Sequence, residues 1–263
     1  MYDCHAHLAL PDFDRDRTEV LRRARRAGVE KILVVAEDHA DSLRVLEVCG
    51  RHPDMLLPCV GLHPDRFAED EPAPPSREEI EAVCDLARQH RARLAAVGEV
   101  GLDYWRVKSK ERRELQRGCL RRMAALAAEL DLPLNVHARS AGRHAIGLLA
   151  DCGARRVLMH AFDGKAGYAV EAARLFGWLF SIPPSVVRSR QKQKLARALP
   201  LEHLALESDS PVLGPDPSMR NEPANLAVTV RCLADLKQTH PAELLGIIDR
   251  NTRNILRAVP NSV

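Results

Sequence analysis

Short apolar segments alternate with longer amphipathic segments along this chain. The apolar segments are rich in leucine and β-branched residues, as is typical of strands that are buried on both faces of a parallel sheet. They predict eight strands, at residues 1–5, 31–36, 56–61, 94–98, 133–137, 156–160, 177–182 and 203–207. Strands that alternate with helices in this way form a parallel sheet covered by helices.

The segments between the strands have the periodicity of amphipathic helices. Residues 14–28 place Val20, Leu21, Ala24 and Ala27 on one face and end at a glycine, which is a common helix terminator. Further helices are expected at residues 77–92, 224–238 and 241–257, and a proline-rich exposed loop is expected at residues 69–76.

The longest helix is expected from Ser109 to Asp131. Its arginines lie mostly on one side and predict a solvated surface. The apolar residues that are expected to face the core are Leu115, Cys119, Met123, Leu126 and Leu130.

Eight strand–helix repeats in 263 residues indicate an α/β fold, a single and somewhat irregular (β/α)₈ barrel. A barrel of this kind occupies ~250 residues, so we expect one domain over residues 1–263. Its functional site would lie at the carboxyl ends of the strands.

The charge of the chain is nearly balanced. Lysine and arginine number 39 against 36 aspartate and glutamate residues, which gives a formal net charge of +3. This balance excludes a nucleic-acid protein that relies on bulk positive charge. It leaves open an enzyme in which bound cations meet a phosphate locally.

The cysteines and the hydropathy pattern bear on location. The seven cysteines form no Cys-x-x-Cys motif, which indicates small core side chains in a reducing compartment. The N-terminus lacks the pattern of a secretory signal, and no apolar run approaches the ~20 residues that span a bilayer. We therefore expect a cytoplasmic protein without a membrane association.

Potential metal ligands follow five of the apolar segments. They are His5, His7, Glu99, His137, His160 and Asp209. Imidazole and carboxylate groups in this number suit one or two divalent cations. Because a barrel gathers the carboxyl ends of its strands on one face, the fold would bring these side chains together.

The local sequence supports this interpretation at each position. His5 and His7 are two residues apart on a strand and therefore point the same way, although a His-x-His motif alone is a weak signal. Gly98 and Gly101 flank Glu99, whose two carboxylate oxygens are suited to bridging two ions. Asp209 is a candidate metal ligand and proton acceptor.

A supporting residue is expected near Asp209. Glu207 lies two positions earlier on the same strand and is a candidate to orient a ligand imidazole, with an ordinary buried ion pair as the alternative.

Several ordered motifs resemble those of TatD-type metal-dependent deoxyribonucleases, which belong to the amidohydrolase-like barrels. The motifs are His5-Ala6-His7, Gly61-Leu62-His63-Pro64, Gly98-Glu99-Val100-Gly101-Leu102-Asp103, His137-Ala138-Arg139, His160-Ala161-Phe162-Asp163-Gly164 and Glu207-Ser208-Asp209-Ser210-Pro211. The segments 11–16, 140–143, 181–185 and 220–223 further resemble the TatD-domain-containing protein 3 subgroup.

This resemblance implies a role for individual residues. It implies a two-metal centre that is bridged by Glu99, with the other five candidate ligands around it, and it implies that His63 and Arg139 face the phosphate. The expected ions are Mg²⁺ or Mn²⁺, with Zn²⁺ as an alternative. The expected partner is DNA, bound by a monomer that needs no obligate protein partner.

The rim of the site carries further candidates. The basic segment 188–194 follows the seventh strand and is interpreted mainly as a solvated helix face, with backbone contacts to nucleic acid as the alternative. Tyr104, Trp105 and Phe162 follow strand ends and are candidates for stacking on bases, with ordinary packing as the alternative for Trp105.

These observations favour hydrolysis of phosphodiester bonds, most plausibly at 3′ ends of DNA. The same centre acting on an aminoacyl ester, amide or lactone is the main alternative, because a fold does not fix a substrate. A barrel that only binds metal is the third possibility. No lysine ends a predicted strand, which favours the glutamate-bridged phosphodiesterase over the cyclic amidases that use a carboxylated lysine.

Overall fold

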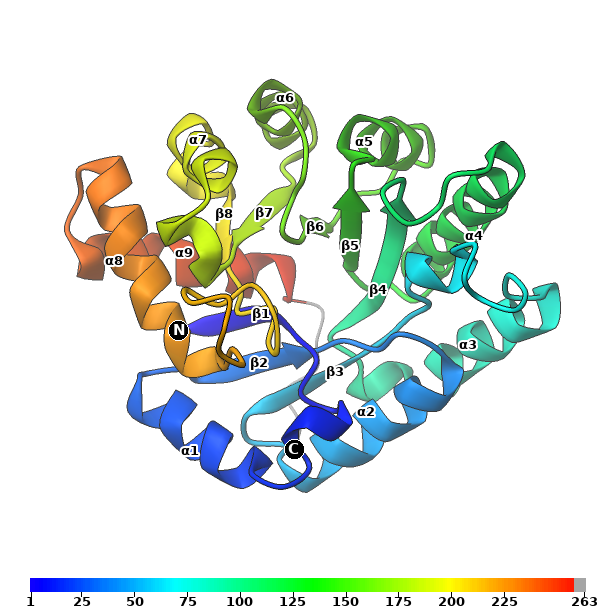
Figure 1. Cartoon of the computed structure of the whole chain (residues 1–263), viewed down its shortest axis with the longest axis horizontal. Coiled ribbons are helices and arrows are strands. Elements are labelled where there is room, and N and C mark those ends of the chain that lie inside the picture. Colours follow the sequence, from blue (N-terminus) through cyan, green and yellow to red (C-terminus); the bar gives the residue numbers. More distant parts are fainter. Residues whose placement is uncertain (258–263) are drawn as a thin grey trace.

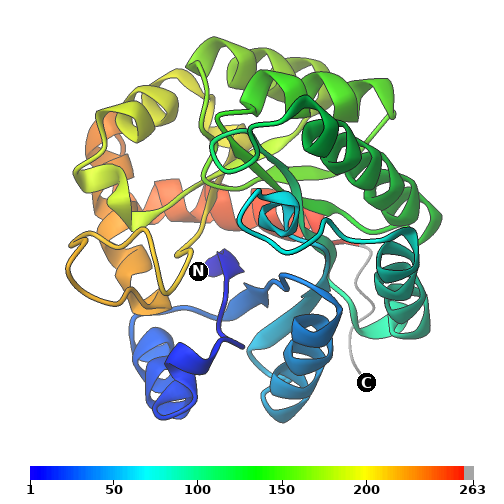
Figure 2. The same cartoon turned by 45° about the vertical axis from the view of Figure 1, so that its right-hand side comes forward.

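A computed structural model describes residues 1–257 as an eight-stranded barrel surrounded by helices (Figures 1 and 2). All neighbouring strands are parallel and follow the chain order. The strands are β1 (Tyr2–Ala6), β2 (Lys31–Val34), β3 (Leu56–Val60), β4 (Ala96–Asp103), β5 (Leu134–Arg139), β6 (Val157–Met159), β7 (Leu179–Ile182) and β8 (Leu204–Leu206). This arrangement confirms the fold class that the sequence predicts.

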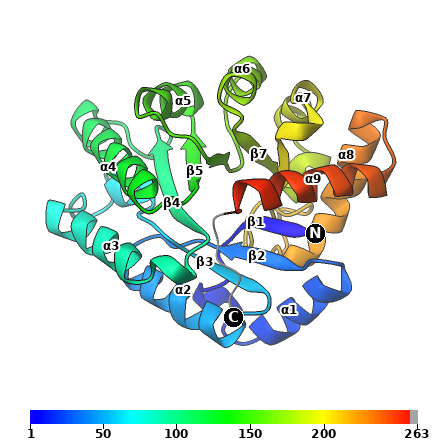
Figure 3. The same ribbon diagram turned by 180° about the vertical axis from the view of Figure 1, so that it is seen from behind.

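The helices lie outside the strands, as the view from behind also shows (Figure 3). They are α1 (Arg17–Arg26), α2 (His39–Arg51), α3 (Arg77–Gln89), α4 (Lys110–Glu129), α5 (Gly142–Asp151), α6 (Ala166–Phe176), α7 (Arg190–Ala198), α8 (Leu226–Lys237) and α9 (Pro241–Ile255). None of these helices, over residues 1–257, is both long enough and apolar enough to cross a membrane.

Strand lengths differ around the barrel, in agreement with the expected irregularity. β4 continues past its expected end at Gly98 to Asp103, because its second half pairs with β5 up to the register pair Asp103 and Arg139. β6 and β8 have only three residues each. The longest strand pairing of the barrel therefore lies directly beneath the expected site.

The helix α4 corrects one expectation about the core. Cys119, Met123 and Leu126 are buried as predicted, but Leu115 is 50% exposed. Gln116 occupies the inward position instead, where its amide donates to the carbonyl of Pro64 and accepts from the backbone N–H of Asp103. A polar side chain faces inward here because two buried backbone groups need a partner.

The barrel closes between β1 and the segment that follows β8. The backbone N–H of Asp209 donates to the carbonyl of His5 at 2.9 Å, and that of His7 donates to the carbonyl of Ser210 at 2.8 Å. The N–H of Ser208 donates to Oδ1 of Asp3 at 2.8 Å. We call this contact between residues 3–7 and 208–210 the seam, since loop hydrogen bonds take the place of a strand ladder there.

Five of the seven cysteines fit the expectation of core thiols, whereas Cys152 is exposed and Cys232 is partly buried. Cys4, Cys49, Cys59, Cys84 and Cys119 are buried, and all seven cysteines are unpaired.

Candidate metal centre

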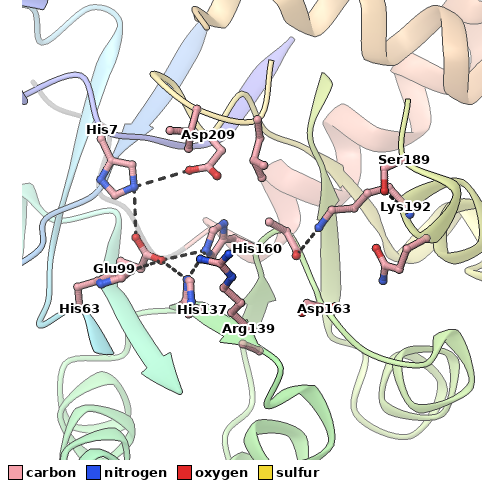
Figure 4. Close-up of a pocket in the computed structure, with 15 residues that line it drawn as sticks. His7, His63, Glu99, His137, Arg139, His160, Asp163, Ser189, Lys192 and Asp209 are labelled. Carbon is pink, nitrogen blue, oxygen red and sulfur yellow. Dashed lines mark hydrogen bonds and ion pairs between the residues drawn. The ribbon is translucent and has the colours of Figure 1, made fainter. Parts of the chain in front are cut away.

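A cavity of about 550 Å³ opens at the carboxyl ends of the strands (Figure 4). The side chains that line its floor come from most of the barrel. They are His7, His63, Glu99, His137, His160 and Asp209. The buried His5 lies beside them, so the fold brings together all six predicted metal ligands.

Glu99 lies at the centre of this group. It is buried in the middle of β4, and its two carboxylate oxygens face different sets of imidazoles. Oε2 is 3.3 Å from Nε2 of His5 and 3.3 Å from Nε2 of His7. Oε1 is 2.9 Å from Nδ1 of His137 and 2.9 Å from Nε2 of His160.

The Oε2 side of Glu99 is completed by Asp209. Its Oδ1 lies 3.5 Å from Nε2 of His5 and 3.7 Å from Nε2 of His7. The seam holds these residues in place, because the backbone of Asp209 is bonded to the carbonyl of His5. Asp209 thus joins His5 and His7, and the Nε2 atoms of these two histidines lie against one oxygen of Glu99.

The Oε1 side of Glu99 includes one further imidazole. Nε2 of His63, which follows β3, is 3.2 Å from Oε1. His63 was expected to face the phosphate, and its Nδ1 is occupied by the backbone N–H of Asp65 at 3.1 Å. Its Nε2 therefore carries the hydrogen and can donate to Glu99 or to an anionic substrate.

The arrangement fits divalent cations. Three groups of candidate ligand atoms cluster within 4.8 Å: His5, His7 and Asp209; His5, Glu99 and His160; His63, Glu99 and His137. Oε2 of Glu99 is buried and, among the described residues, has no hydrogen-bond donor. A buried carboxylate oxygen in this state is costly unless a cation balances its charge.

The ligand imidazoles are oriented by residues behind them. Nδ1 of His5 contacts Oδ1 of Asn135 at 2.8 Å, and the amide of Asn135 donates to the carbonyl of Cys4 at 2.7 Å. Nε2 of His137 contacts Oδ2 of Asp103 at 3.0 Å. Such contacts fix which ring nitrogen carries the proton and leave the other nitrogen for a metal.

Asn135 and Asp103 were not assigned these roles from the sequence, although signals for both were present. Asn135 lies two residues before His137 on β5, a spacing that places both side chains on one face. Asp103 ends the motif that contains Glu99. A search of the strand positions that share a face with each ligand would have found both residues.

The charge distribution draws cations into this centre. Burial raises the pKa of Glu99, but the imidazoles of His63, His5 and His160 outweigh it and hold that pKa well below its ordinary value. Burial lowers the pKa of His137, while the hydrogen bonds to Asp103 and Glu99 reverse this effect and raise it to about 9. The carboxylates therefore attract positive charge to the imidazole nitrogens, whether as protons or as metal ions.

His160 is held by similar forces. Burial lowers its pKa, and Glu99 and Glu207 together raise it to about 9. Oε2 of Glu207 is 3.6 Å from Nδ1 of His160, which is beyond hydrogen-bond length. The same carboxylate accepts from the hydroxyl of Ser181 at 2.6 Å and from the backbone N–H of Ala161 at 2.8 Å. Glu207 thus supports the turn after His160, and its role in orienting a ligand imidazole stays a prediction.

Close backbone approach beneath the ligands requires glycine at two positions. Gly101 has φ +152°, and a Cβ there would lie 2.0 Å from the carbonyl oxygen of His137. A Cβ on Gly98 would lie 2.6 Å from Cβ of Asn135. The two glycines that flank Glu99 therefore let β4 lie against β5 at the level of the ligands.

Lys192 corrects the interpretation of the basic segment. Most of residues 188–194 are at least partly exposed, as expected, but Lys192 is 8% exposed and lines the cavity. Its ammonium donates to the carbonyl of Ala161, and burial lowers its pKa. Lys192 and Glu207 thus hold the carbonyl and the N–H of the same residue, Ala161, next to His160.

The aromatic candidates on the rim differ in exposure. Phe162 is fully buried and packs edge-on against Phe180, so its predicted contact with bases is wrong. It lies three residues after the end of β6. Tyr104 is half-buried, with the guanidinium of Arg113 stacked 4.4 Å from its ring centroid. Trp105 is 51% exposed.

Comparison with known proteins adds to this geometry. Residues 2–257 match the family model described as TatD related DNase. Deoxyribonuclease TATDN3 of Homo sapiens is 41% identical over 263 residues, which cover 99% of this chain and 94% of that protein. The 3′-5′ ssDNA/RNA exonuclease TatD of Erwinia tasmaniensis is 31% identical, covering 97% of this chain and 99% of that protein.

One of the similar solved structures is also that of a TatD homolog. The crystal structure of YJJV, a TatD homolog from Escherichia coli K12, superposes with a TM-score of 0.87. The two chains are 26% identical, and the superposition covers 98% of each. The likeness in sequence and the likeness in fold both extend over nearly the whole chain.

Proposed function

This chain belongs to the family of TatD-related DNases, and from that premise we propose that it hydrolyses phosphodiester bonds at 3′ ends of DNA with two divalent cations. The observation that carries the proposal is the position of Glu99, whose two carboxylate oxygens face two separate sets of ligand atoms. A carboxylate between two cations is the usual way to hold a pair ~3.5–4 Å apart.

In this proposal each oxygen of Glu99 would contribute to holding one cation. His5, His7 and Asp209 would hold the first cation with Oε2, and His137 and His160 would hold the second with Oε1. When bound, such ions supply positive charge to a phosphate and make water a better nucleophile. Mg²⁺ and Mn²⁺ are the proposed ions because carboxylates and imidazoles suit both, and Zn²⁺ fits the imidazoles as well.

The side chains around the cavity would divide the remaining work. The carboxylate of Asp209 is placed to accept a proton from the attacking water. The imidazole of His63 and the guanidinium of Arg139 would bind the non-bridging oxygens of the phosphate and hold them in the cavity. The charge of the guanidinium would also balance the charge that builds up on the phosphate in the transition state.

The direction in which the strand is degraded is proposed from the name of one relative. The protein from Erwinia tasmaniensis is named a 3′-5′ exonuclease of single-stranded DNA and RNA. The cavity is large enough for one terminal nucleotide at the metal centre, which suits removal of units from an end. The name of that relative also makes RNA a substrate to be tested beside DNA.

The test uses single-stranded DNA and RNA oligonucleotides that carry a label at the 5′ end or the 3′ end, with Mg²⁺, Mn²⁺ or Zn²⁺ added to purified protein. We expect release of the 3′ label as a single nucleotide and stepwise shortening of the 5′-labelled strand. Glu99→Gln should lower this activity by at least ~10²-fold. Glu114→Gln on the surface of α4, where the side chain is 67% exposed, is the matched control and should retain full activity.

Two results would refute the proposal. One is full nuclease activity in Glu99→Gln, which would show that another protein or another site cleaves the DNA. The other is a wild-type protein that cleaves none of the oligonucleotides but hydrolyses an aminoacyl ester, amide or lactone under the same conditions.

A further inference from the structure

The turn between β4 and α4 carries Trp105 on the rim of the cavity. Its indole is 51% exposed, which is unusual in a chain whose other tryptophan, Trp178, is fully buried. The proposed hydrolysis makes no use of Trp105. Its position and its neighbours nevertheless link it closely to the metal centre.

One carboxylate joins this turn to a metal ligand. Oδ1 of Asp103 accepts from the backbone N–H groups of Trp105 and Arg106, each at 2.8 Å. Oδ2 of the same residue contacts Nε2 of His137 at 3.0 Å. Trp105 is therefore held at a fixed place relative to a ligand imidazole.

Arg139 links Trp105 to the cavity itself. Its guanidinium carbon lies 3.8 Å from the centroid of the indole ring, and its side chain lines the cavity two residues beyond His137 (Figure 4). Stacking on a ring leaves the N–H groups at the edge of a guanidinium plane free to donate.

The N–H groups of Arg139 are free in this way. Within residues 1–257, this guanidinium donates no hydrogen bond and has no acidic partner. Arg113 stacks on Tyr104 in the same region, but it donates to the carbonyls of Val107 and Tyr104. A cation that stacks at a cavity mouth without a counter-charge is suited to an anionic ligand.

We propose that Trp105 and Arg139 form a nucleotide subsite. A nucleobase stacks on the face of the indole that the guanidinium of Arg139 does not cover, with the ammonium of Lys108 nearby at 5.9 Å from the ring centroid, while Arg139 donates to the adjoining phosphate. This inference rests on the proposed function. It assigns the subsite to a nucleotide next to the scissile bond. Aromatic side chains bind any of the bases, because every base presents a flat π-face. A base must leave its helical stack to bind here, so the subsite favours single-stranded over base-paired ends.

The main experiment combines variants of the protein with a change in the substrate. Initial rates are measured for Trp105→Ala and Trp105→Phe on single-stranded oligonucleotides with either a normal nucleotide or an abasic one at each of the two positions that flank the scissile phosphate. We expect Trp105→Ala to lower kcat/KM on the normal strand by at least ~5-fold, mainly through KM. Trp105→Phe should restore most of the loss.

The abasic substrate separates stacking from a structural effect. The wild type should lose a similar factor on one of the two abasic strands, and Trp105→Ala should lose little more there, because the stacking partner is already absent. Leu115→Ala, which removes another half-exposed apolar side chain, is the control and should match the wild type on all substrates. Equal factors for Trp105→Ala on normal and abasic strands would overturn the proposal.

Fluorescence gives a second readout without turnover. Trp105 and Trp178 are the only two tryptophans of the chain, and Trp178 is buried. An oligonucleotide with phosphorothioate linkages at its 3′ end should quench the emission of the wild type but not that of Trp105→Phe. Equal quenching of both proteins would overturn the subsite. A wild type that cleaves no nucleic acid would instead refute the proposed function itself.

Discussion

The two halves of the metal centre carry similar ligands on different kinds of support. His137 and His160 stand at the ends of β5 and β6, and with Oε1 of Glu99 they form what we call the ladder half. His5 and His7 contact Oε2, and with Asp209 beside them they form the seam half.

The ladder half is positioned by strand pairing. β4 and β5 run in register from Gly101 opposite His137 to Asp103 opposite Arg139. The pairing of β5 with β6 continues this arrangement as far as Val136 and Met159. The register of β5 therefore positions His137, and His160 directly follows the last paired residue of β6.

The seam half is positioned by buried polar groups. Asp209 follows β8 and has φ +53°, so strand pairing does not place it. The amide of Asn221 donates to the carbonyls of Ser208 and Val212, at 2.6 and 2.8 Å. The hydroxyl of Ser210 donates to that of Ser208 at 2.8 Å. Similar ligand geometry is thus reached through a ladder on one side and through a few specific hydrogen bonds on the other.

The comparison predicts that Glu99→Gln has the largest effect, because Glu99 alone belongs to both halves. The amide keeps the shape of the side chain but removes the negative charge that both cations need. We expect a loss of activity of at least ~10²-fold and a loss of bound metal from both positions. Metal content by mass spectrometry checks this, and a variant that keeps one ion per chain would show that the halves are independent.

Gly101→Ala tests the ladder half. The added Cβ would lie 2.0 Å from the carbonyl oxygen of His137, in a backbone conformation that alanine avoids. We expect a loss of more than ~3 kcal/mol in the free energy of unfolding, measured by denaturant titration. A variant as stable as the wild type would mean that β4 and β5 separate easily at this level.

Asn221→Ala tests the seam half. It leaves the buried carbonyls of Ser208 and Val212 without their donor, which we expect to cost ~1–3 kcal/mol of stability. Activity should fall by ~10–100-fold and recover in part as the metal concentration is raised, because only the support of Asp209 is lost. Unchanged metal affinity would show that the seam does not depend on this amide.

Removal of the metal tests both halves together. Ions that bind only the folded chain stabilise it by ~2.7 kcal/mol at a concentration of 100 Kd, so a chelator should lower the melting temperature. The shift should be absent in Glu99→Gln. A melting temperature that does not respond to chelator in the wild type would argue against metal binding at this centre.

Gly118→Ala is expected to have the smallest effect and serves as the control for Gly101. It lies within α4, and a Cβ there meets no atom within 4 Å. The substitution should stabilise the protein by ~0.5–1 kcal/mol, because alanine favours a helix over glycine. Opposite signs for the two glycine variants in the same denaturant titration would confirm that close strand approach, rather than glycine content, governs Gly101.

The sequence predicted the parts of the molecule that depend on local pattern. The strands lie where apolar segments end on His5, Glu99, His137 and His160, and the topology then requires those ends to meet. The same reasoning placed Glu207 beside the site, where it supports the turn after β6.

The remaining parts depend on partners that are distant in sequence. Gln116 rather than Leu115 faces inward, because it bonds to Pro64 and Asp103. Lys192 is buried because its ammonium donates a hydrogen bond to a carbonyl after β6, which no pattern within α7 indicates. Asn135 acquires its role only when His5, 130 positions away in the sequence, lies beside it.

The seam also has a consequence for how the active chain is assembled. The contact between Asp3 and Ser208 spans 205 positions, so the first and the last strands must meet before the cluster around Oε2 exists. Long-range contacts of this kind form late in folding, since the intervening chain has to be ordered first. Catalytic activity should therefore appear in one step at the end of folding. A chain that stops folding before its last strand docks would not cleave the nucleic acids around it.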